Sequence, residues 1–214
     1  MAGTSTKRLR KFCIFAGSYP GKDEYFENAA KKLGEVMVKQ KYEVIYGGGC
    51  MGLMGAVAAT ALVGGSSVLG IVPTTWSHLC GATIGKEVRV NSIQERIALM
   101  MHSSDAFIAL PGGIGTLEEI VCVTSWSSLT RNKKPIGLLN INGYFDSLLC
   151  FLDNAVTNGF MFTEIRRILI YAATIEELFE KLQAFKCFPD INESILGKRK
   201  IDDDKRDLDC SLSL

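Results

Sequence analysis

The sequence predicts a single α/β domain of the Rossmann-like, doubly wound type, in which helices cover both faces of a parallel sheet. Short, nearly continuous apolar runs alternate along the chain with longer segments of helical periodicity. Strands that are apolar on both faces are typical of parallel sheets, whose crossover connections are usually helices. A length of 214 residues with 47% apolar residues is sufficient for one well-buried domain and short for two.

The individual elements follow from these runs in chain order. The runs FCIFA, YEVIY and SVLGIV predict strands at residues 12–16, 42–46 and 67–72, and DAFIAL, PIGLLN and ILIY predict strands at 105–110, 135–140 and 168–171. The longer segments predict helices at 24–39, 51–62, 92–103, 115–129, 145–158 and 174–184. Thr174 and Glu177 have the spacing of a capping box, which marks the start of the last helix.

The two ends of the chain differ from this pattern. Residues 1–10 predict a flexible N-terminus, residues 11–186 the Rossmann-like nucleotide-binding domain, and residues 187–214 a disordered tail. The tail carries two basic clusters, Lys198-Arg199-Lys200 and Lys205-Arg206, which can serve as a nuclear address, and spaced leucines that can serve as a short peptide ligand. A solvated tail with neither role is the simpler interpretation.

The composition excludes several classes of partner. The 24 basic and 23 acidic residues leave a net charge of +1, so the basic surface of a nucleic-acid-binding protein is not expected. No apolar segment reaches the roughly 18 residues of a membrane-spanning helix, and no signal-peptide core follows the short basic N-terminus. We therefore expect a cytoplasmic protein, also present in the nucleus, that acts on a small molecule and not on nucleic acid or a membrane.

Three loops follow predicted strands at the edge of the sheet where doubly wound folds bind ligands. They are Gly17-Ser18, residues 47–55 and residues 111–116, and the last begins the motif PGGIGTLEE at 111–119. Glycines let this backbone turn sharply, and the first amides of the following helix point outward, so the turn predicts a phosphate site. Phosphate binding does not explain Glu119, because its negative charge would lie close to the negative charge of the phosphate. We therefore expect this carboxylate to take part in the reaction.

The glycines at 47, 49 and 52 match G-x-G-x-x-G after a strand, which is one half of a dinucleotide-binding fingerprint. The other half is missing, because the acid that holds the ribose should follow about 20 residues later, where this chain has Ile71, Val72 and Pro73. Neither glycine loop ends in the G-K-[ST] of a triphosphate-binding loop. We therefore expect neither NAD nor a nucleoside triphosphate, and we expect some of these glycines to serve only the close packing of strand and helix.

Metal sites are not expected either. The two histidines, His78 and His102, are far apart in sequence, and neither has a cysteine or carboxylate at metal-ligand spacing. The sequence therefore predicts chemistry without a metal or cofactor.

Several segments together resemble the LONELY GUY family of plant and microbial phosphoribohydrolases, over about residues 11–185. They are YGGG at 46–49, GLMG at 52–55, Arg96, the PGGIGTLEE motif, Trp126, GLLN at 137–140, and Gly143-Tyr144. Members of that family release a free cytokinin base from its riboside 5′-monophosphate, with ribose 5-phosphate as the other product. The resemblance implies hydrolysis of the N-glycosidic bond of a purine nucleoside monophosphate by a homodimer.

The resemblance also implies that Arg96 and Glu119 are the catalytic pair. A carboxylate near the anomeric carbon can stabilise the positive charge that develops on the ribose and can orient the attacking water. A guanidinium can anchor the phosphate or the departing purine. Substrate contacts are expected from this pair and from Gly17, Ser18, Gly48, Gly49, Met54, Ile97, Gly112, Gly113, Ile114, Gly115, Thr116, Leu117, Glu118 and Ser125, the last at a position where the family usually has threonine.

The chain departs from the family pattern at three places. Ile97 stands where typical members have lysine, Trp76 to Leu79 replace a loop that carries a substrate-binding acid, and Ile114 replaces a tyrosine. Two hypotheses therefore stay open, an active phosphoribohydrolase and a catalytically weak or inactive nucleotide-binding protein on the same scaffold. Lysine decarboxylase, a third label attached to this motif family, normally requires a pyridoxal phosphate lysine, which none of the glycine loops supplies.

The apolar segment at residues 120–129, which includes Trp126, is a candidate for the dimer interface. Ordinary packing of this helix against the sheet is the alternative interpretation. The sequence does not distinguish between them.

Overall fold

The computed structural model describes residues 9–76, 81–129 and 133–186. In the first half, β1 (Lys11–Phe15), α1 (Glu24–Lys39), β2 (Glu43–Tyr46), α2 (Gly52–Val63), β3 (Val68–Pro73), the 3-10 helix η1 (Thr74–Trp76) and β4 (Lys86–Val90) follow one another. The second half contains α3 (Ile93–Ser103), β5 (Ala106–Ala109), α4 (Ile114–Leu129), β6 (Ile136–Leu139), η2 (Ile141–Gly143), α5 (Asp146–Thr157), α6 (Thr163–Arg166), β7 (Leu169–Ala172) and α7 (Ile175–Gln183). The predicted tail lies outside the described residues.

The strands form one seven-stranded sheet in the order β4-β3-β2-β1-β5-β6-β7, and every neighbouring pair is parallel. From β1 the chain adds β2, β3 and β4 on one side, and it then returns to add β5, β6 and β7 on the other. The direction of winding therefore reverses between β1 and β5. This arrangement confirms the predicted doubly wound, single-domain α/β fold.

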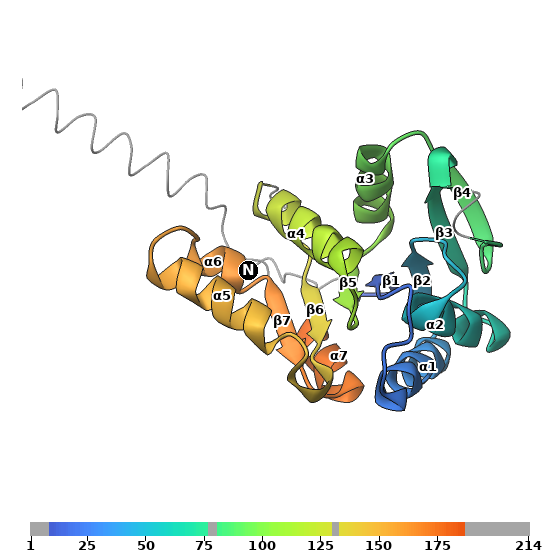
Figure 1. Ribbon diagram of the computed structural model, residues 1–214, viewed down its shortest axis with the longest axis horizontal. Coiled ribbons are helices and arrows are strands. Elements are labelled where there is room, and N and C mark those ends of the chain that lie inside the picture. Colours follow the sequence, from blue (N-terminus) through green and yellow to red (C-terminus); the bar gives the residue numbers. More distant parts are fainter. Residues whose placement is uncertain (1–8, 77–80, 130–132, 187–214) are drawn as a thin grey trace, which may run out of the picture.

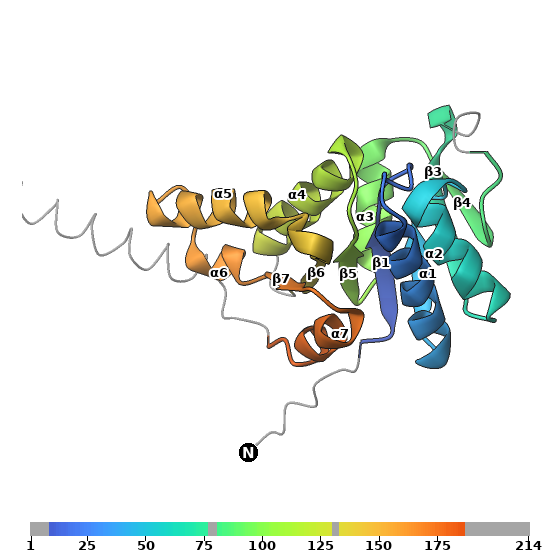
Figure 2. The ribbon, with the colours of Figure 1, turned by 60° about the horizontal axis from the view of Figure 1, so that its bottom comes forward.

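Alternate residues of each strand face two separate hydrophobic layers. Phe12 and Ile14 of β1 pack into the layer that contains α1, α2 and α7, whereas Cys13 and Phe15 pack into the layer that contains α3, α4 and α5. Figure 1 shows the strands between these two groups of helices, and the turned view in Figure 2 shows α4 and α5 on one side of β5–β7 and α7 on the other. None of the helices in the described residues is long and apolar enough to span a membrane.

Local hydrogen bonds explain where two of the helices begin. The Oγ of Ser92 accepts the Glu95 backbone N–H at 3.1 Å, and the Asn91 N–H donates to the Glu95 carboxylate at 2.7 Å, so two groups at the start of α3 are satisfied. Thr174 Oγ1 accepts the Glu177 N–H at 3.3 Å, as expected for a side-chain cap of the predicted last helix. The cap of α3 also fixes the first turn of this helix, which carries Arg96, one of the predicted catalytic residues.

The sequence pattern missed β4 and the short helix α6. β4 forms the edge of the sheet beside β3, and Lys86, Glu87 and Arg89 are exposed on it. Charged side chains are common on edge strands, where they discourage pairing with another molecule, and they also remove the apolar run that identifies a buried strand. The missed strand is therefore the most exposed part of the sheet.

Candidate active site

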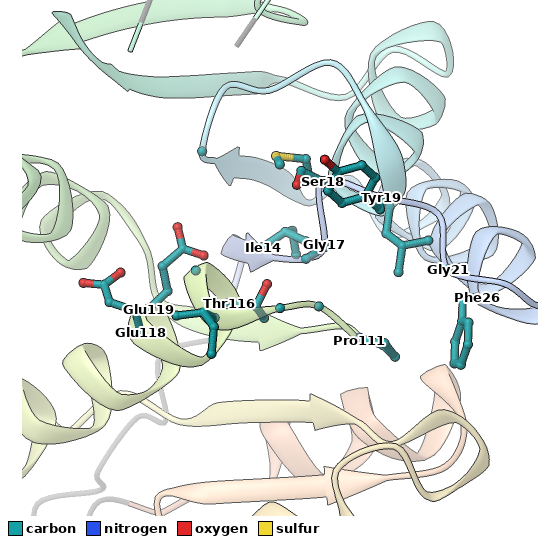
Figure 3. Close-up of a pocket in the computed structure, with 18 of the residues that line it drawn as sticks. Ile14, Gly17, Ser18, Tyr19, Gly21, Phe26, Pro111, Thr116, Glu118 and Glu119 are labelled. Atoms are coloured by element: carbon teal, nitrogen blue, oxygen red, sulfur yellow. The ribbon is translucent and has the colours of Figure 1, made fainter. Parts of the chain in front are cut away.

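A cavity of about 580 Å³ opens where the loops after β1 and β5 meet. The winding of the sheet reverses between these two strands, and doubly wound folds bind ligands at the carboxyl ends of strands at such a point. The start of α2 and single residues of α1, α3, η1, the loop after β2 and the β6–α5 connection also line it. Figure 3 shows the loop after β1 facing the start of α4 across this space.

The turn at residues 111–116 is held from both sides. The Gly17 N–H donates to the Pro111 carbonyl at 3.0 Å, and the Tyr144 hydroxyl donates to the Gly112 carbonyl at 2.6 Å. Gly112 has no room for a side chain, because a Cβ there would lie 2.1 Å from Thr116 Oγ1. The first amides of α4 have no partners within the helix, so this fixed turn directs backbone N–H groups and the positive end of the helix dipole at a ligand.

Arg96 and Glu119 form an ion pair in the wall of the same cavity. Arg96 Nη2 lies 2.9 Å from Glu119 Oε1, and the two side chains are only 8% and 10% exposed. Arg96 Nε donates to the Ile71 carbonyl at 3.2 Å, which fixes the guanidinium from the β3 side. Gly47 leaves space for it, since a Cβ at Gly47 would lie 2.2 Å from Arg96 Nη2. Strand ends and helix starts thus bring together two residues that are distant in sequence.

Burial raises the pKa of Glu119 to about 7, although the charge and hydrogen bond of Arg96 oppose this shift. The neighbouring carboxylate of Glu118 adds a smaller upward effect on the same pKa. Burial also raises the pKa of the Cys13 thiol, so this residue stays a neutral thiol on β1. A carboxyl group whose pKa lies near neutrality can both release and accept a proton at physiological pH, as acid–base catalysis requires.

Aromatic side chains form much of the remaining lining, and sequence reasoning did not select them for it. Tyr19, Phe26, Trp76 and Tyr144 line the cavity, and the rings of Phe26 and Tyr144 meet edge to face at 6.0 Å. Flat apolar surfaces of this kind suit a planar base. Each of these residues lies in or just beyond a connection that follows a strand, and that position is the signal that could have identified them.

Eleven of the predicted site residues line the cavity. They are Gly17, Ser18, Met54, Arg96, Gly112, Gly113, Ile114, Gly115, Thr116, Glu118 and Glu119. Glu118 also accepts a hydrogen bond from the Cys122 thiol at 3.3 Å, so part of its carboxylate is already occupied within α4.

Five predicted binding residues do not line the cavity. Ile97 is 2% exposed and belongs to the hydrophobic layer behind the site, and Leu117 packs against the same layer. Gly48 faces Val72 of β3, and Gly49 faces the Met54 side chain. Ser125 lies on the exposed face of α4, beyond the residues that line the cavity. Gly47, and not Gly48 or Gly49, is the glycine of its loop that reaches the cavity.

The comparisons with known proteins fit this geometry. A family model described as "Possible lysine decarboxylase" matches residues 54–182. The chain is 44% identical over 185 residues to a rice protein (Oryza sativa subsp. japonica) named probable cytokinin riboside 5′-monophosphate phosphoribohydrolase LOGL9, covering 86% of this chain and 82% of that protein. It is 45% identical over 180 residues to the Arabidopsis thaliana cytokinin riboside 5′-monophosphate phosphoribohydrolase LOG4, covering 83% of this chain and 84% of that protein.

A solved structure shares the fold at low sequence identity. The molybdenum cofactor carrier protein from Chlamydomonas reinhardtii matches with a TM-score of 0.61 and 19% identity, over 81% of this chain and 95% of that chain. This likeness concerns the arrangement of strands and helices alone.

Proposed function

We propose that this chain, which belongs to the family of cytokinin riboside 5′-monophosphate phosphoribohydrolases, hydrolyses the N-glycosidic bond of such a nucleotide to a free cytokinin base and ribose 5-phosphate. The observation that carries the proposal is the buried pair of Arg96 and Glu119, 2.9 Å apart, in a cavity that the turn at 111–116 also lines. A nucleoside monophosphate matches both features, because it has a phosphate for the turn and a glycosidic bond for the carboxylate.

The phosphate is expected at the start of α4. Gly113 and Gly115 line the cavity, and a Cβ at either position would meet no atom within 4 Å. Protein packing therefore does not require glycine at these two positions, whereas close approach of a ligand to the backbone does. The helix dipole, the first-turn amides and the hydroxyl of Thr116 favour an anion there.

Glu119 is the proposed catalytic base. As the bond between the anomeric carbon and the base nitrogen weakens, positive charge develops on the ribose, and a nearby carboxylate stabilises it. The carboxylate takes a proton from the attacking water while the new carbon–oxygen bond forms. The departing base keeps the electron pair of the broken bond and takes up one proton, so that one water molecule is divided between the two products.

Arg96 is the proposed partner of this carboxylate. The charge of its guanidinium and its hydrogen bond to Glu119 oppose the effect of burial, so part of Glu119 stays ionised. The same cation is available to the phosphate or to the departing purine, where it would stabilise negative charge. Without Arg96, burial alone would hold Glu119 as a neutral acid that cannot act as a base.

The alternative label of lysine decarboxylase does not fit the cavity. Pyridoxal phosphate is held as a Schiff base by a lysine amine, and the described residues that line this cavity include no lysine.

One observation favours a nucleotide-binding protein without turnover as the second candidate function. Trp76 lines the cavity in the segment where the family carries a substrate-binding acid. The change at Ile97 gives less support to this candidate, because that side chain lies in the core and removes no charge from the cavity.

We further propose that the protein is a homodimer that uses α4. Ile114, Val121 and Leu129 are apolar side chains that are 82%, 57% and 69% exposed on this helix. A surface helix normally has a polar outer face, so an apolar one indicates cover by another chain. Sedimentation velocity should give a dimer, and Val121→Glu should convert it to a monomer; a monomeric wild type would contradict this proposal.

The proposed location is the cytoplasm and the nucleus. The basic clusters that suggest a nuclear address lie in the tail, outside the described residues. A fluorescent fusion of the full chain is expected in both compartments, and a fusion truncated after residue 186 is expected to lose nuclear enrichment. Equal distributions of the two fusions would assign no role to the tail in targeting.

A single assay tests the function and the substrate class together. Purified protein is incubated with isopentenyladenosine 5′-monophosphate or with AMP, and free base and ribose 5-phosphate are measured separately. We expect both products in equal amounts from the cytokinin nucleotide, less from AMP, and a loss of roughly 100-fold or more in Glu119→Gln. Glu176→Gln is the matched control, because Glu176 is an exposed carboxylate on α7 paired with Lys32.

The outcomes separate the two candidate functions. If wild type and Glu119→Gln both bind the nucleotide and neither releases free base, the protein is a nucleotide-binding protein without turnover. Base release that Glu119→Gln does not reduce would remove Glu119 from the mechanism.

A further inference from the structure

The guanidinium of Arg96 is surrounded by groups from four different parts of the fold. Glu119 of α4 accepts from Nη2, and the carbonyl of Ile71 in β3 accepts from Nε. The backbone at Gly47, after β2, leaves just enough space for Nη2. The fourth group is the indole of Trp76 in η1, whose ring centroid lies 5.7 Å from Arg96 Cζ.

We propose that Trp76 is a positioning residue for the catalytic pair, in which its indole face covers the Arg96 guanidinium, holds it against Glu119 and limits the access of water to both. This inference rests on the proposed function of the pair. It concerns a residue that the resemblance to the family assigns to no role, in a segment where this chain departs from the family sequence.

The exposures of the two side chains support this arrangement. Trp76 is 37% exposed, whereas Arg96 is 7% exposed, so the ring forms an outer layer over a cation that is itself nearly buried. An aromatic ring within about 6 Å of a guanidinium attracts it, and the attraction grows when water is excluded. Guanidinium groups are also weakly hydrated and stack readily on aromatic faces. The contact is thus favourable at the place where loss of water from the cation would otherwise cost free energy.

The cover over Arg96 should also act on Glu119. Arg96 on α3 and Glu118 on α4 are the charged groups that shift the pKa of Glu119. The charge of Glu119 in turn raises the pKa of two neighbouring thiols, Cys13 on β1 and Cys122 on α4. Burial is the largest cause of the raised pKa of Glu119, and Trp76 is part of the same cavity wall. If Trp76 is removed and water enters, the pKa of Glu119 should fall toward its ordinary value, since these neighbouring groups are unchanged.

A simpler role for Trp76 is that of a wall against which the substrate base lies. The two roles differ in their kinetics. A wall contributes equally to substrate and transition state, so its loss raises KM and leaves kcat unchanged. A residue that positions the catalytic pair affects kcat and the pH dependence of the reaction.

The test compares Trp76→Ala, Trp76→Phe and the matched control Tyr171→Ala. Tyr171 on β7 is 5.8 Å from the guanidinium of Arg166, which gives an equivalent contact away from the cavity. With isopentenyladenosine 5′-monophosphate, Trp76→Ala is expected to lower kcat roughly two- to thirty-fold and to move the acidic limb of the pH profile to lower pH. Trp76→Phe should retain most of the wild-type kcat, and Tyr171→Ala should match wild type.

The proposal is overturned if Trp76→Ala raises only KM, or if Trp76→Phe is as impaired as Trp76→Ala. If wild type shows no turnover, the proposed function fails, and the positioning role is then tested by the ¹³C NMR titration of the Glu119 carboxyl, assigned with Glu119→Gln. A lower pKa in Trp76→Ala than in wild type supports the role, and equal values overturn it. Trp76→Leu takes the place of Trp76→Ala if circular dichroism shows that the alanine variant does not fold.

Discussion

The two glycine loops look alike in sequence but are glycine-rich for different reasons. In the loop at residues 47–55, a Cβ at any of the five glycines would lie within 3.0 Å of another protein atom. In the turn at residues 111–116, the same is true of Gly112, but a Cβ at Gly113 or Gly115 would meet no atom within 4 Å. The first loop therefore needs glycine for its own packing, and the second has two glycines that its packing does not need.

The difference shows what glycine indicates about a ligand. The first loop matches half of a dinucleotide fingerprint, yet its glycines serve contacts with Arg96, with the strand β3 and with the loop after β1. It contributes to the site indirectly, because Gly47 lets Arg96 approach the strand ends. Glycines that line a cavity without steric need, such as Gly113 and Gly115, indicate more directly where a ligand approaches.

Among the variants that test the difference between the two glycine loops, Gly52→Ala is expected to have the largest effect on stability. Gly52 has a φ of +59°, and a Cβ there would lie 2.3 Å from the Ser18 backbone. Left-handed strain and overlap with a backbone together should lower the free energy of unfolding by about 3 kcal/mol or more, measured by urea denaturation. Gly65→Ala is the control, because Gly65 has a φ of +92° and open space, so it isolates the strain. Equal losses in the two variants would mean that close packing does not explain the first loop.

A second test concerns the buried pair that Gly47 admits. The pKa of Glu119 is about 7 in the folded protein and 4.5 in an ordinary carboxyl, so the folded state binds the proton more tightly. The contribution of Glu119 to stability is therefore complete below pH 4.5 and is lost as pH rises toward about 7. Between pH 4.5 and 8 the free energy of unfolding should fall by about 3 kcal/mol more in wild type than in Glu119→Gln.

This comparison removes the effects of other acids. Glu87, Glu176 and Glu177 have lowered pKa values because of their hydrogen bonds, but they are the same in both proteins. Urea denaturation at several pH values gives the two curves. Parallel curves would show that the burial of Glu119 is not coupled to its protonation.

A smaller effect, concentrated on activity, is expected for Gly47→Ala. The new methyl would lie 2.2 Å from Arg96 Nη2, the atom that forms the bond to Glu119, so the guanidinium would have to move. The end of an arginine side chain can shift, so we expect a stability loss of only about 1 kcal/mol, with kcat/KM lowered about tenfold or more. Gly49→Ala is the matched control, since the three atoms nearest to its Cβ would all belong to the flexible Met54 side chain. Full activity in Gly47→Ala would show that the pair does not depend on this close approach.

The sequence predicted most of the fold because the buried strands carry their own signal. Apolar runs at the centre of the sheet and amphipathic helices between them are local patterns, and their alternation implies the parallel topology. The edge strand β4 escaped prediction, because an exposed strand with alternating charges lacks that run. The local sequence pattern thus identifies a strand only where the strand is buried and its residues must therefore be apolar.

The site was less accessible to prediction, because its geometry depends on contacts between distant segments. The motif at 111–119 identified Glu119, and the family resemblance supplied Arg96, but only the fold brings the two within 2.9 Å. The rotation of the loop after β2 decides whether Gly47 or Gly48 faces the cavity. In the same way, the face of α3 that meets the sheet decides whether Ile97 lies in the cavity or in the core. Trp76 was visible as a departure from the family, but its contact with Arg96 was not.

Gly113→Ala is expected to have the smallest effect on stability. It is also the variant that most clearly distinguishes the second glycine loop from the first. Gly113 is outside the left-handed region, and its Cβ would enter open cavity space, so the free energy of unfolding should stay within about 0.5 kcal/mol of wild type. The same methyl would separate a phosphate from the first amides of α4, so the affinity for AMP, measured by calorimetric titration, should fall about tenfold. Gly115→Ala should behave alike in binding and should not lose stability, because alanine favours the helix. A variant that loses stability but binds AMP normally would place Gly113 with the packing glycines of the first loop, and the phosphate would then have to lie elsewhere in the cavity.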